Sequence, residues 1–325
     1  MTEPQLIPLT QQESVVWCFR HNRHYSKRAE SRLAGSANRP LAANRSSFSI
    51  EFCAGAARQS YDTILSMEFL RLDSRPALRR PILVLSFAGW SDAGAAATTA
   101  ARYLADQLMA KKIATIDPEE FYDFYRQRPV VRLNERKVRE IHWPSYDFHC
   151  GAGIGVDRDF VLGIGIEPHL RWRTFTETML RFAQECQAEM IVTLGAYLDE
   201  VLYTRPVPLT GFSTDAKLVD ELDLVPSRYQ GPTGIIGVLA DACRAGGVPH
   251  LSLWASLPHY LNVSQNPRGT LALILRLNQW LGLRVDTSPL ETAAADFQAK
   301  INEAVNADPK LSAFVRELKK REFEQ

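Results

Sequence analysis

The sequence has few cysteines and no excess of charge of either sign. Its five cysteines are scattered over 325 residues without CxxC spacing, so neither a disulfide framework nor a cysteine-based zinc site is predicted. Lysine and arginine number 38, against 37 aspartates and glutamates, and this balance gives no support for general nucleic-acid binding. The scattered cysteines are typical of reduced thiols in the cytoplasm.

Long apolar runs are also missing. No stretch approaches the length of a membrane span, and no apolar segment follows a basic start, as it would in a secretory leader. The seven histidines lack HxH and HxxxH spacing, and no Walker loop is present, so neither a metal site nor ATP binding is predicted. We therefore expect a cytoplasmic protein without a metal, a cofactor, nucleic acid or a membrane as its partner.

Residues 1–66 lack the periodicity of helices and strands. They contain eight basic and five acidic residues, with isolated aromatic side chains and no continuous apolar face. Such a composition buries too little apolar area to offset the entropy of ordering the chain. We therefore expect a disordered extension over 1–66, in preference to an arginine-rich targeting segment.

The remaining sequence is organised around the apolar run Ile82–Phe87. An apolar run followed by an alanine-rich segment, here to about Ala110, is typical of a central parallel strand buried on both faces and its crossover helix. Further strands are predicted at Ile113–Ile116, Asp159–Ile166, Met190–Leu194 and Val248–Trp254, and helices at Thr174–Ala188, Asp215–Leu222, Ile235–Ala245 and Pro267–Leu281. This alternation predicts a three-layer α/β/α sandwich with a mostly parallel sheet over 67–285.

Smaller elements complete the prediction. Phe69–Leu72 is expected as an edge strand, and two short strands around Asn134-Glu135 are expected to form a β-hairpin. The glycines between 151 and 155 predict a flexible loop. A capping box from Ser288 to Glu291, and a helix restart at Asp308-Pro309, predict a C-terminal helical hairpin over 286–325.

Polar residues that follow the predicted strands are the candidate site. Ligands of open α/β sheets bind outside the carboxyl ends of the strands. Carboxylates at this rim could serve acid–base chemistry, and the turn before the helix at Ile235 could hold an anion on its backbone amides. The candidate ligand-binding residues are Ser91, Asp92, Glu167, His169, Glu200, Gly231, Thr233, Gly234, His259 and Tyr260.

Each candidate also has a structural interpretation. Ser91 or Asp92 could cap the following helix, the carboxylates at Glu167 and Glu200 could pair with nearby arginines, and His259 could bond to the backbone. The turn GWSDAG has one residue too many before its second glycine to be a nucleophile elbow. No catalytic residue is therefore assigned from the sequence.

A second candidate surface is rich in aromatic side chains and arginine. Both residue types are enriched at the hot spots of protein interfaces, and the alternative is an aromatic loop that covers the core. The candidate protein-binding residues are Phe121, Tyr122, Tyr125, Arg126 and Arg128.

Six segments carry a family resemblance. They are FAGWSDAG from Phe87, FYDFYRQRPVV from Phe121, GIEPHLRW from Gly165, LGAYLDEVLYTRPVPLTGFS from Leu194, GPTGI from Gly231 and WASLPHYL from Trp254. Together, and in this order, they resemble the proteasome assembly chaperone two family in its actinobacterial form. The resemblance covers about Met67 to Arg321.

The resemblance implies both a fold and a function. It implies a nucleoside-phosphorylase-like sandwich with a C-terminal helical addition, and homo-oligomers, with trimers favoured. It also implies a non-enzymatic protein that works by protein–protein binding, with proteasome subunits as partners. Many relatives dock through a C-terminal tail with a penultimate tyrosine, whereas this chain ends in Phe323-Glu324-Gln325.

The alternative is a small-molecule-binding enzyme or pseudo-enzyme with a phosphorylase-like pocket at the carboxyl rim. The two hypotheses differ in the surface that they require. An enzyme needs a pocket in which ionisable groups converge, whereas a chaperone needs an exposed apolar patch.

Overall fold

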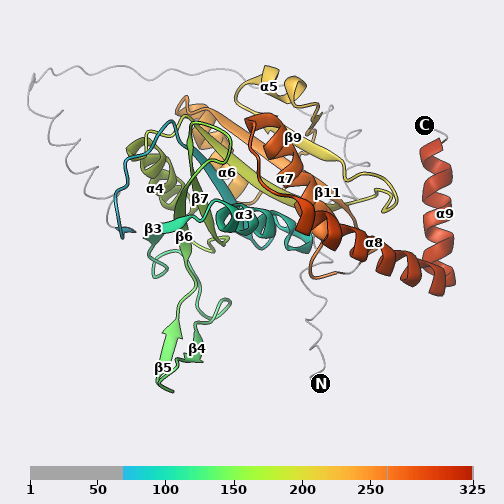
Figure 1. Cartoon of the computed structure of the whole chain (residues 1–325), viewed down its shortest axis with the longest axis horizontal. Helices are drawn as coiled ribbons and strands as arrows, with labels where there is room; N and C mark the ends of the chain where they lie inside the picture. The colour runs from blue at the N-terminus through green and yellow to red at the C-terminus, as the bar shows by residue number, and fades with distance from the viewer. Residues whose placement is uncertain (1–68, 262, 324–325) are drawn as a thin grey trace, which may run out of the picture. The chain divides into compact units, whose positions relative to one another are not determined.

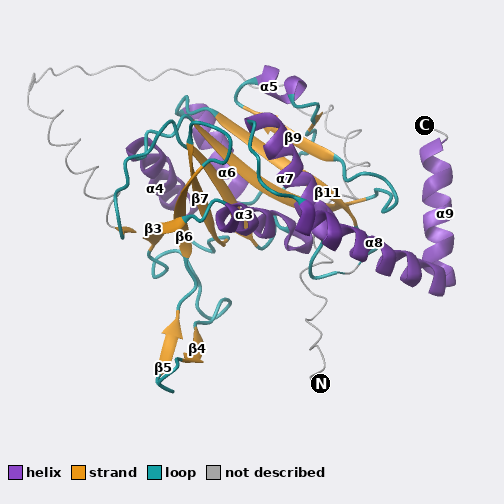
Figure 2. Ribbon diagram, in the orientation of Figure 1, coloured by secondary structure: helices purple, strands orange, loops and turns teal. Residues whose placement is uncertain are grey.

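The computed structural model describes residues 69–261 and 263–323. The predicted extension over 1–66 lies outside the described residues. The last two residues of the chain, Glu324 and Gln325, also lie outside them. Figures 1 and 2 show the described elements, which form one large mixed sheet with helices on both faces and a separate small hairpin.

Nine strands form the large sheet of the described residues, in the order β1-β3-β6-β7-β2-β8-β11-β9-β10. Only the four central strands β7-β2-β8-β11 are mutually parallel, and of the outer pairs β9–β10 alone is parallel. The prediction of a mostly parallel sheet is therefore correct for the centre and wrong for the flanks. The strands are β1 (Leu70–Leu72), β2 (Ile82–Ala88), β3 (Lys111–Ile116), β6 (Tyr146–Ala152), β7 (Asp159–Ile166), β8 (Met190–Asp199), β9 (Leu209–Ser213), β10 (Val225–Pro226) and β11 (His250–Pro258).

The strand β6 replaces part of the predicted glycine loop. Gly151 lies in β6, and a Cβ atom there would be 2.7 Å from the carbonyl oxygen of Leu108, so this position needs glycine for close packing and not for flexibility. Tyr146 and Phe148 are buried while the residues between and after them are partly exposed. This alternation is the sequence signal for a strand that the glycines obscured.

Helices cover both faces of the sheet. On one face lie α3 (Ala96–Gln107) and α7 (Pro267–Leu281), and on the other α4 (Trp172–Glu185) and α6 (Ile235–Ala245). Strand β2 supplies both cores, because Val84 packs on the α3 side while Leu83 and Leu85 pack on the α4 side. All three of these side chains are fully buried. The three-layer α/β/α arrangement follows from this burial of both faces.

Local signals set the helix boundaries. In α7, the Asn266 side chain accepts a hydrogen bond from the Gly269 amide, Pro267 takes the first turn, and Gly282 ends the helix with φ of 68°, in line with known preferences for helix ends. The helix predicted from Ala93 begins later, at Ala96, because Gly94 and Ala95 both have positive φ.

The C-terminal helices form a corner and not the predicted hairpin. Helix α9 (Pro309–Phe323) rises steeply from the end of α8 (Ser288–Ala307) in Figure 1. Asp308 lies at the junction, and its Oδ1 accepts from the amides of Lys310 (2.8 Å) and Leu311 (3.2 Å). The start of α8 is also shifted by one residue, because its N-cap is Thr287 instead of Ser288.

The predicted β-hairpin is present at the predicted place. Strands β4 (Val130–Leu133) and β5 (Arg139–His142) pair only with each other, and every residue in both is exposed. Figure 2 shows this ribbon apart from the large sheet. We call residues 126–143 the arm.

Burial on β2 makes a direct prediction about stability. Leu85→Ala removes a fully buried side chain from the middle of β2, so we expect a loss of about 2–5 kcal/mol in the free energy of unfolding. Leu170→Ala is the matched control, since Leu170 is half exposed, and it should cost about 1 kcal/mol or less. Urea unfolding of the full chain measures both, and equal losses would contradict the assignment of β2 to the core.

Candidate functional site

The turn after β2 contains Ser91 and Asp92, which are 1% and 8% exposed. One carboxylate oxygen of Asp92 accepts hydrogen bonds from the amides of Ala97 (2.8 Å) and Thr98 (3.2 Å), and the other accepts from the Thr98 hydroxyl. Burial raises the pKa of Asp92, and these hydrogen bonds act in the opposite direction. Asp92 therefore stabilises the start of α3, as the capping interpretation predicts.

Glu167 follows β7 and lies at the start of α6. Its Oε1 accepts a hydrogen bond from the Ile235 amide at 2.8 Å. A Cβ atom at Gly234 would lie only 2.6 Å from that oxygen, so glycine is required for the carboxylate to reach the helix. Burial raises the pKa of Glu167, while the amides of Ile235 and Trp90 act to lower it.

This contact changes the interpretation of the turn at Gly231. The sequence predicts an anion site on the amides that open α6, and the structure fills it with the chain's own Glu167 carboxylate. The arginine partner considered for Glu167 is not its main contact. Within the turn, Thr233 directs its hydroxyl toward the Gly234 carbonyl (3.4 Å), and the Tyr229 hydroxyl donates to the Pro232 carbonyl (2.8 Å).

Three of the candidate residues meet at this rim. The Ser91 hydroxyl is buried and has no hydrogen-bond partner among the described residues. It lies 3.1 Å from the position that a Cβ atom at Gly234 would take, next to Glu167 Oε1. Ser91, Glu167 and Gly234 therefore converge as the sequence predicts, but the carboxylate among them is occupied by α6.

His169 is directed elsewhere. Its Nδ1 accepts a hydrogen bond from the Asp123 amide at 3.1 Å, and its ring meets the edge of Tyr122 with the ring centroids 5.9 Å apart. Burial lowers the pKa of His169, and the positive charge of Arg126 adds to this. His169 therefore fastens the segment from Phe121, and does not join Glu167 in a catalytic group.

Glu200, His259 and Tyr260 lie under the C-terminal corner. Glu200 forms an ion pair with Arg321 of α9 at 3.1 Å, and the ring of His259 packs against Phe314 with centroids 5.7 Å apart. The Tyr260 hydroxyl accepts from the Tyr203 amide and donates to the Val201 carbonyl. The structure does not bring these residues to Ser91 and Glu167, because the loops after β8 and β11 turn toward α9.

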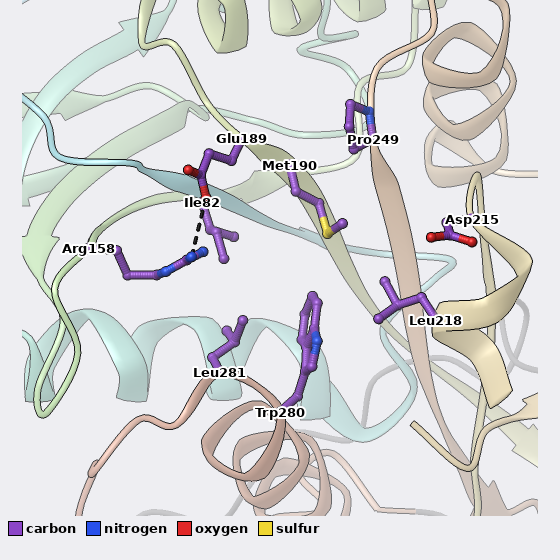
Figure 3. Close-up of a pocket in the computed structure, with 9 residues that line it drawn as sticks. All are labelled: Ile82, Arg158, Glu189, Met190, Asp215, Leu218, Pro249, Trp280 and Leu281. Carbon is purple, nitrogen blue, oxygen red and sulfur yellow. Dashed lines mark ion pairs between the residues drawn. The ribbon is translucent and has the colours of Figure 1, made fainter. Parts of the chain in front are cut away.

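A cavity of about 470 Å³ lies at the other end of the parallel strands. Figure 3 shows its lining, with the Arg158–Glu189 ion pair (3.2 Å) beside Met190 and Trp280. Hydrogen bonding from Arg80 lowers the pKa of Glu189, so this carboxylate is held ionised and is unsuited to act as a general acid. Sequence reasoning missed this cavity because it sought ligands at the carboxyl ends of the strands.

The predicted aromatic surface is only partly exposed. Phe121 and Tyr122 are buried in the core on the α4 side, so the prediction that they form a protein-binding surface is wrong. Tyr125 is 81% exposed, and the Arg128 guanidinium lies 5.3 Å from the centre of its ring. Arg126 is exposed and pairs with Asp123 at 3.7 Å. The accessible part of this segment therefore begins at Tyr125 and leads into the arm.

The arm exposes large apolar side chains at a density not expected from the sequence. Six of them are at least half exposed: Val130, Val131, Leu133, Val138, Ile141 and Trp143. Opposite residues of an antiparallel pair share a face. Val131 and Ile141 are paired, and on the other face Arg132 is paired with Glu140. One face of the ribbon thus carries Val131, Ile141 and Leu133 with Arg139, and the other carries the oppositely charged Arg132 and Glu140 with Val130 and His142.

No group of three or more His, Cys, Asp or Glu side chains is placed to hold a metal ion within 69–261 and 263–323. Over the same ranges, no helix combines the length and apolar character needed to cross a membrane. Cys150, Cys186 and Cys243 are free thiols in the described part of the chain.

Comparison with known proteins identifies the family. A model described as the PAC2 family matches residues 86–305. The chain belongs to the PAC2 family. This confirms the resemblance to proteasome assembly chaperones that the six sequence segments carry. No curated protein matches the chain significantly.

Several solved structures are similar to most of this chain. A PAC2 family protein from Streptomyces avermitilis is 41% identical with a TM-score of 0.68, over 72% of this chain and 99% of that one. A proteasome-assembly chaperone homologue from Mycobacterium tuberculosis is 38% identical with a TM-score of 0.67. This similarity also covers 72% of this chain and 99% of the homologue. An archaeal proteasome activator from Pyrococcus furiosus, at 19% identity and a TM-score of 0.58, shares the fold over 72% of this chain and 97% of that one.

Glu167 gives a prediction about pH. Because burial raises its pKa in the folded state above the ordinary value of 4.5, its stabilising contribution is present below about pH 4.5 and is lost as the pH rises through the folded-state value. Glu167→Gln keeps an oxygen acceptor for the Ile235 amide but cannot ionise. We expect the wild type to lose stability relative to this variant as the pH rises from about 4.5 through the raised folded-state pKa of Glu167.

Urea unfolding at several pH values measures the difference between the two proteins. Glu303→Gln, at an exposed position on α8, controls for the loss of one acidic side chain. A wild type that gains stability relative to Glu167→Gln as the pH rises would contradict the dominance of burial at this carboxylate.

Proposed function

We propose that this chain is a non-enzymatic, oligomeric, cytoplasmic protein that acts by binding other proteins in a chaperone-like role related to the proteasome. Its partners are copies of itself, with trimers favoured, and proteasome subunits. Its sandwich is proposed to be of the nucleoside-phosphorylase-like kind. The Mycobacterium tuberculosis relative, a proteasome-assembly chaperone homologue, supports the role.

The exposed apolar face of the arm carries the proposal. Monomeric soluble proteins rarely expose a contiguous apolar patch, and a large one marks an interaction site. Here Val131, Ile141 and Trp143 are all at least half exposed on one ribbon. Trp143 meets Phe124 with the ring centroids 4.9 Å apart, which ties the arm to the aromatic segment from Tyr125.

The carboxyl rim supports binding over catalysis. A general acid or base must be free to reach the substrate, whereas Asp92 is engaged by α3 and Glu167 by α6. His259 packs on Phe314 and lies with the C-terminal corner. The candidate acid–base groups are thus engaged in contacts within the fold.

The test is capture of proteasome α-subunits from the protein's own cytosol by the full chain. Val131→Ser with Ile141→Ser removes the central apolar pair of this face, and we expect capture to fall about tenfold or more, since buried apolar anchors dominate interfaces. Arg132→Ser with Glu140→Ser is the matched control on the opposite face of the same ribbon, and it should capture as the wild type does. Absence of α-subunits from the wild-type eluate, or equal capture by all three proteins, would refute the proposal.

A further inference from the structure

We infer that the arm of one copy binds the α5–β10 edge of a second copy, head to tail. This inference rests on the proposed protein-binding role of the arm and names its partner. Helix α5 (Ala216–Glu221) and β10 together form the acidic edge, residues 215–225. The argument comes from the uncovered face of the arm, the opposite charges of the two surfaces and their places in the sheet.

The isolated, exposed hairpin of the arm requires a contact with another protein surface to be stable. An isolated two-stranded hairpin is at best marginally stable in water, and a third layer or strand is normally required. Within the described residues, strands β4 and β5 pair only with each other, so no described strand covers the outer edges of the ribbon. The apolar face with Val131 and Ile141 is exposed as well. A second protein surface would cover this apolar face.

The charges on the arm define the partner. Residues 126–143 contain six arginines or lysines and two glutamates, whereas the rest of 67–325 contains 24 basic and 30 acidic residues. Positive charge is therefore concentrated on the arm, and the body that carries it is acidic. A second copy of the same body offers the opposite charge that steers and orients a docked arm.

The acidic edge carries the exposed negative charge that is opposite to the positive charge of the arm. Residues 215–225 contain four acidic side chains and one lysine, all exposed: Asp215, Asp220, Glu221, Asp223 and Lys217. Val225, in β10, is 58% exposed beside them. Since β10 is the last strand of the described sheet and pairs only with β9, no strand covers its outer side. One of its two residues is Pro226, which has no amide hydrogen, so side chains and charge, and not strand pairing, carry the proposed contact.

The topology makes this contact one between two copies. The arm lies in the connection between β3 and β6, near the β1 edge, and β10 forms the opposite edge of the same sheet. Two different surfaces of one chain then join in a heterologous contact, which closes into a ring when the rotation between copies permits. A contact between two arms would instead bring two basic ribbons together, and like charges oppose it.

Charge reversal on the full chain tests the inference. Arg136→Glu with Arg139→Glu reverses the tip of the arm, and Asp220→Lys with Glu221→Lys reverses the edge. We expect each variant to sediment as a monomer in analytical ultracentrifugation at low salt, and the chain carrying all four substitutions to re-associate at least about tenfold more tightly than either. Asp296→Lys with Glu303→Lys, on exposed positions of α8, is the control and should keep the wild-type mass.

Mixing two variants, one with a defective arm and the other with a defective acidic edge, tests the head-to-tail geometry. A chain with Val131→Ser and Ile141→Ser keeps its edge, and the Asp220→Lys, Glu221→Lys chain keeps its arm. An equimolar mixture should give a one-to-one dimer, because one functional interface remains. Far-UV circular dichroism confirms that each variant is folded.

The outcomes separate this inference from the proposed function. A monomeric wild type overturns both the head-to-tail contact and the self-association in the proposed function. An edge variant with unchanged mass, or a four-site variant that stays monomeric, overturns the head-to-tail contact alone. Arm variants that lose α-subunit capture while keeping the wild-type mass overturn the contact and leave the proposed function standing. Arm variants that change neither mass nor capture overturn both.

Discussion

Two carboxylates at the ends of neighbouring central strands, one buried and one partly buried, join the sheet to a helix on each of its faces. Asp92, after β2, accepts hydrogen bonds from the first turn of α3 on one face. Glu167, after β7, accepts from the first amide of α6 on the other. Each exploits the unpaired amides and positive end of a helix. The apolar cores hold the helix layers on the sheet, and these contacts fix where α3 and α6 begin at the ends of the strands.

The parts of the fold predicted from sequence are those set by local patterns. Strand β7 and helices α6 and α7 have the predicted boundaries, because an unbroken apolar run, a glycine turn and an Asn-Pro start each act within a few residues. Strand β6 was missed because Gly151 reads as a loop residue, and its need for glycine comes from Leu108, far away in the sequence. Close packing of this kind is not visible in a single sequence.

Only part of the arrangement of the candidate site could be predicted, because tertiary contacts are not visible in the sequence. Placement at strand ends correctly grouped Ser91, Glu167 and Gly234. It could not show which way the longer loops turn, and so Glu200 and His259 were expected at the rim although they contact α9. The aromatic segment shows the same limit, because Phe121 and Tyr125 lie four residues apart, one buried and one exposed. Burial in a loop depends on tertiary contacts more than on residue type.

The C-terminal corner has its own small core, formed by Leu202, Tyr203, Leu261, Ile301, Val305, Val315 and Leu318, separate from the two cores of the sandwich. Because this core is much smaller than the cores of the sandwich, we expect the corner to open at a lower free energy than the sheet. Amide hydrogens of α9 should then exchange with solvent through partial opening, while those of β2 exchange only on global unfolding. The corner is thus the part of the fold that can detach and re-attach while the sandwich stays intact.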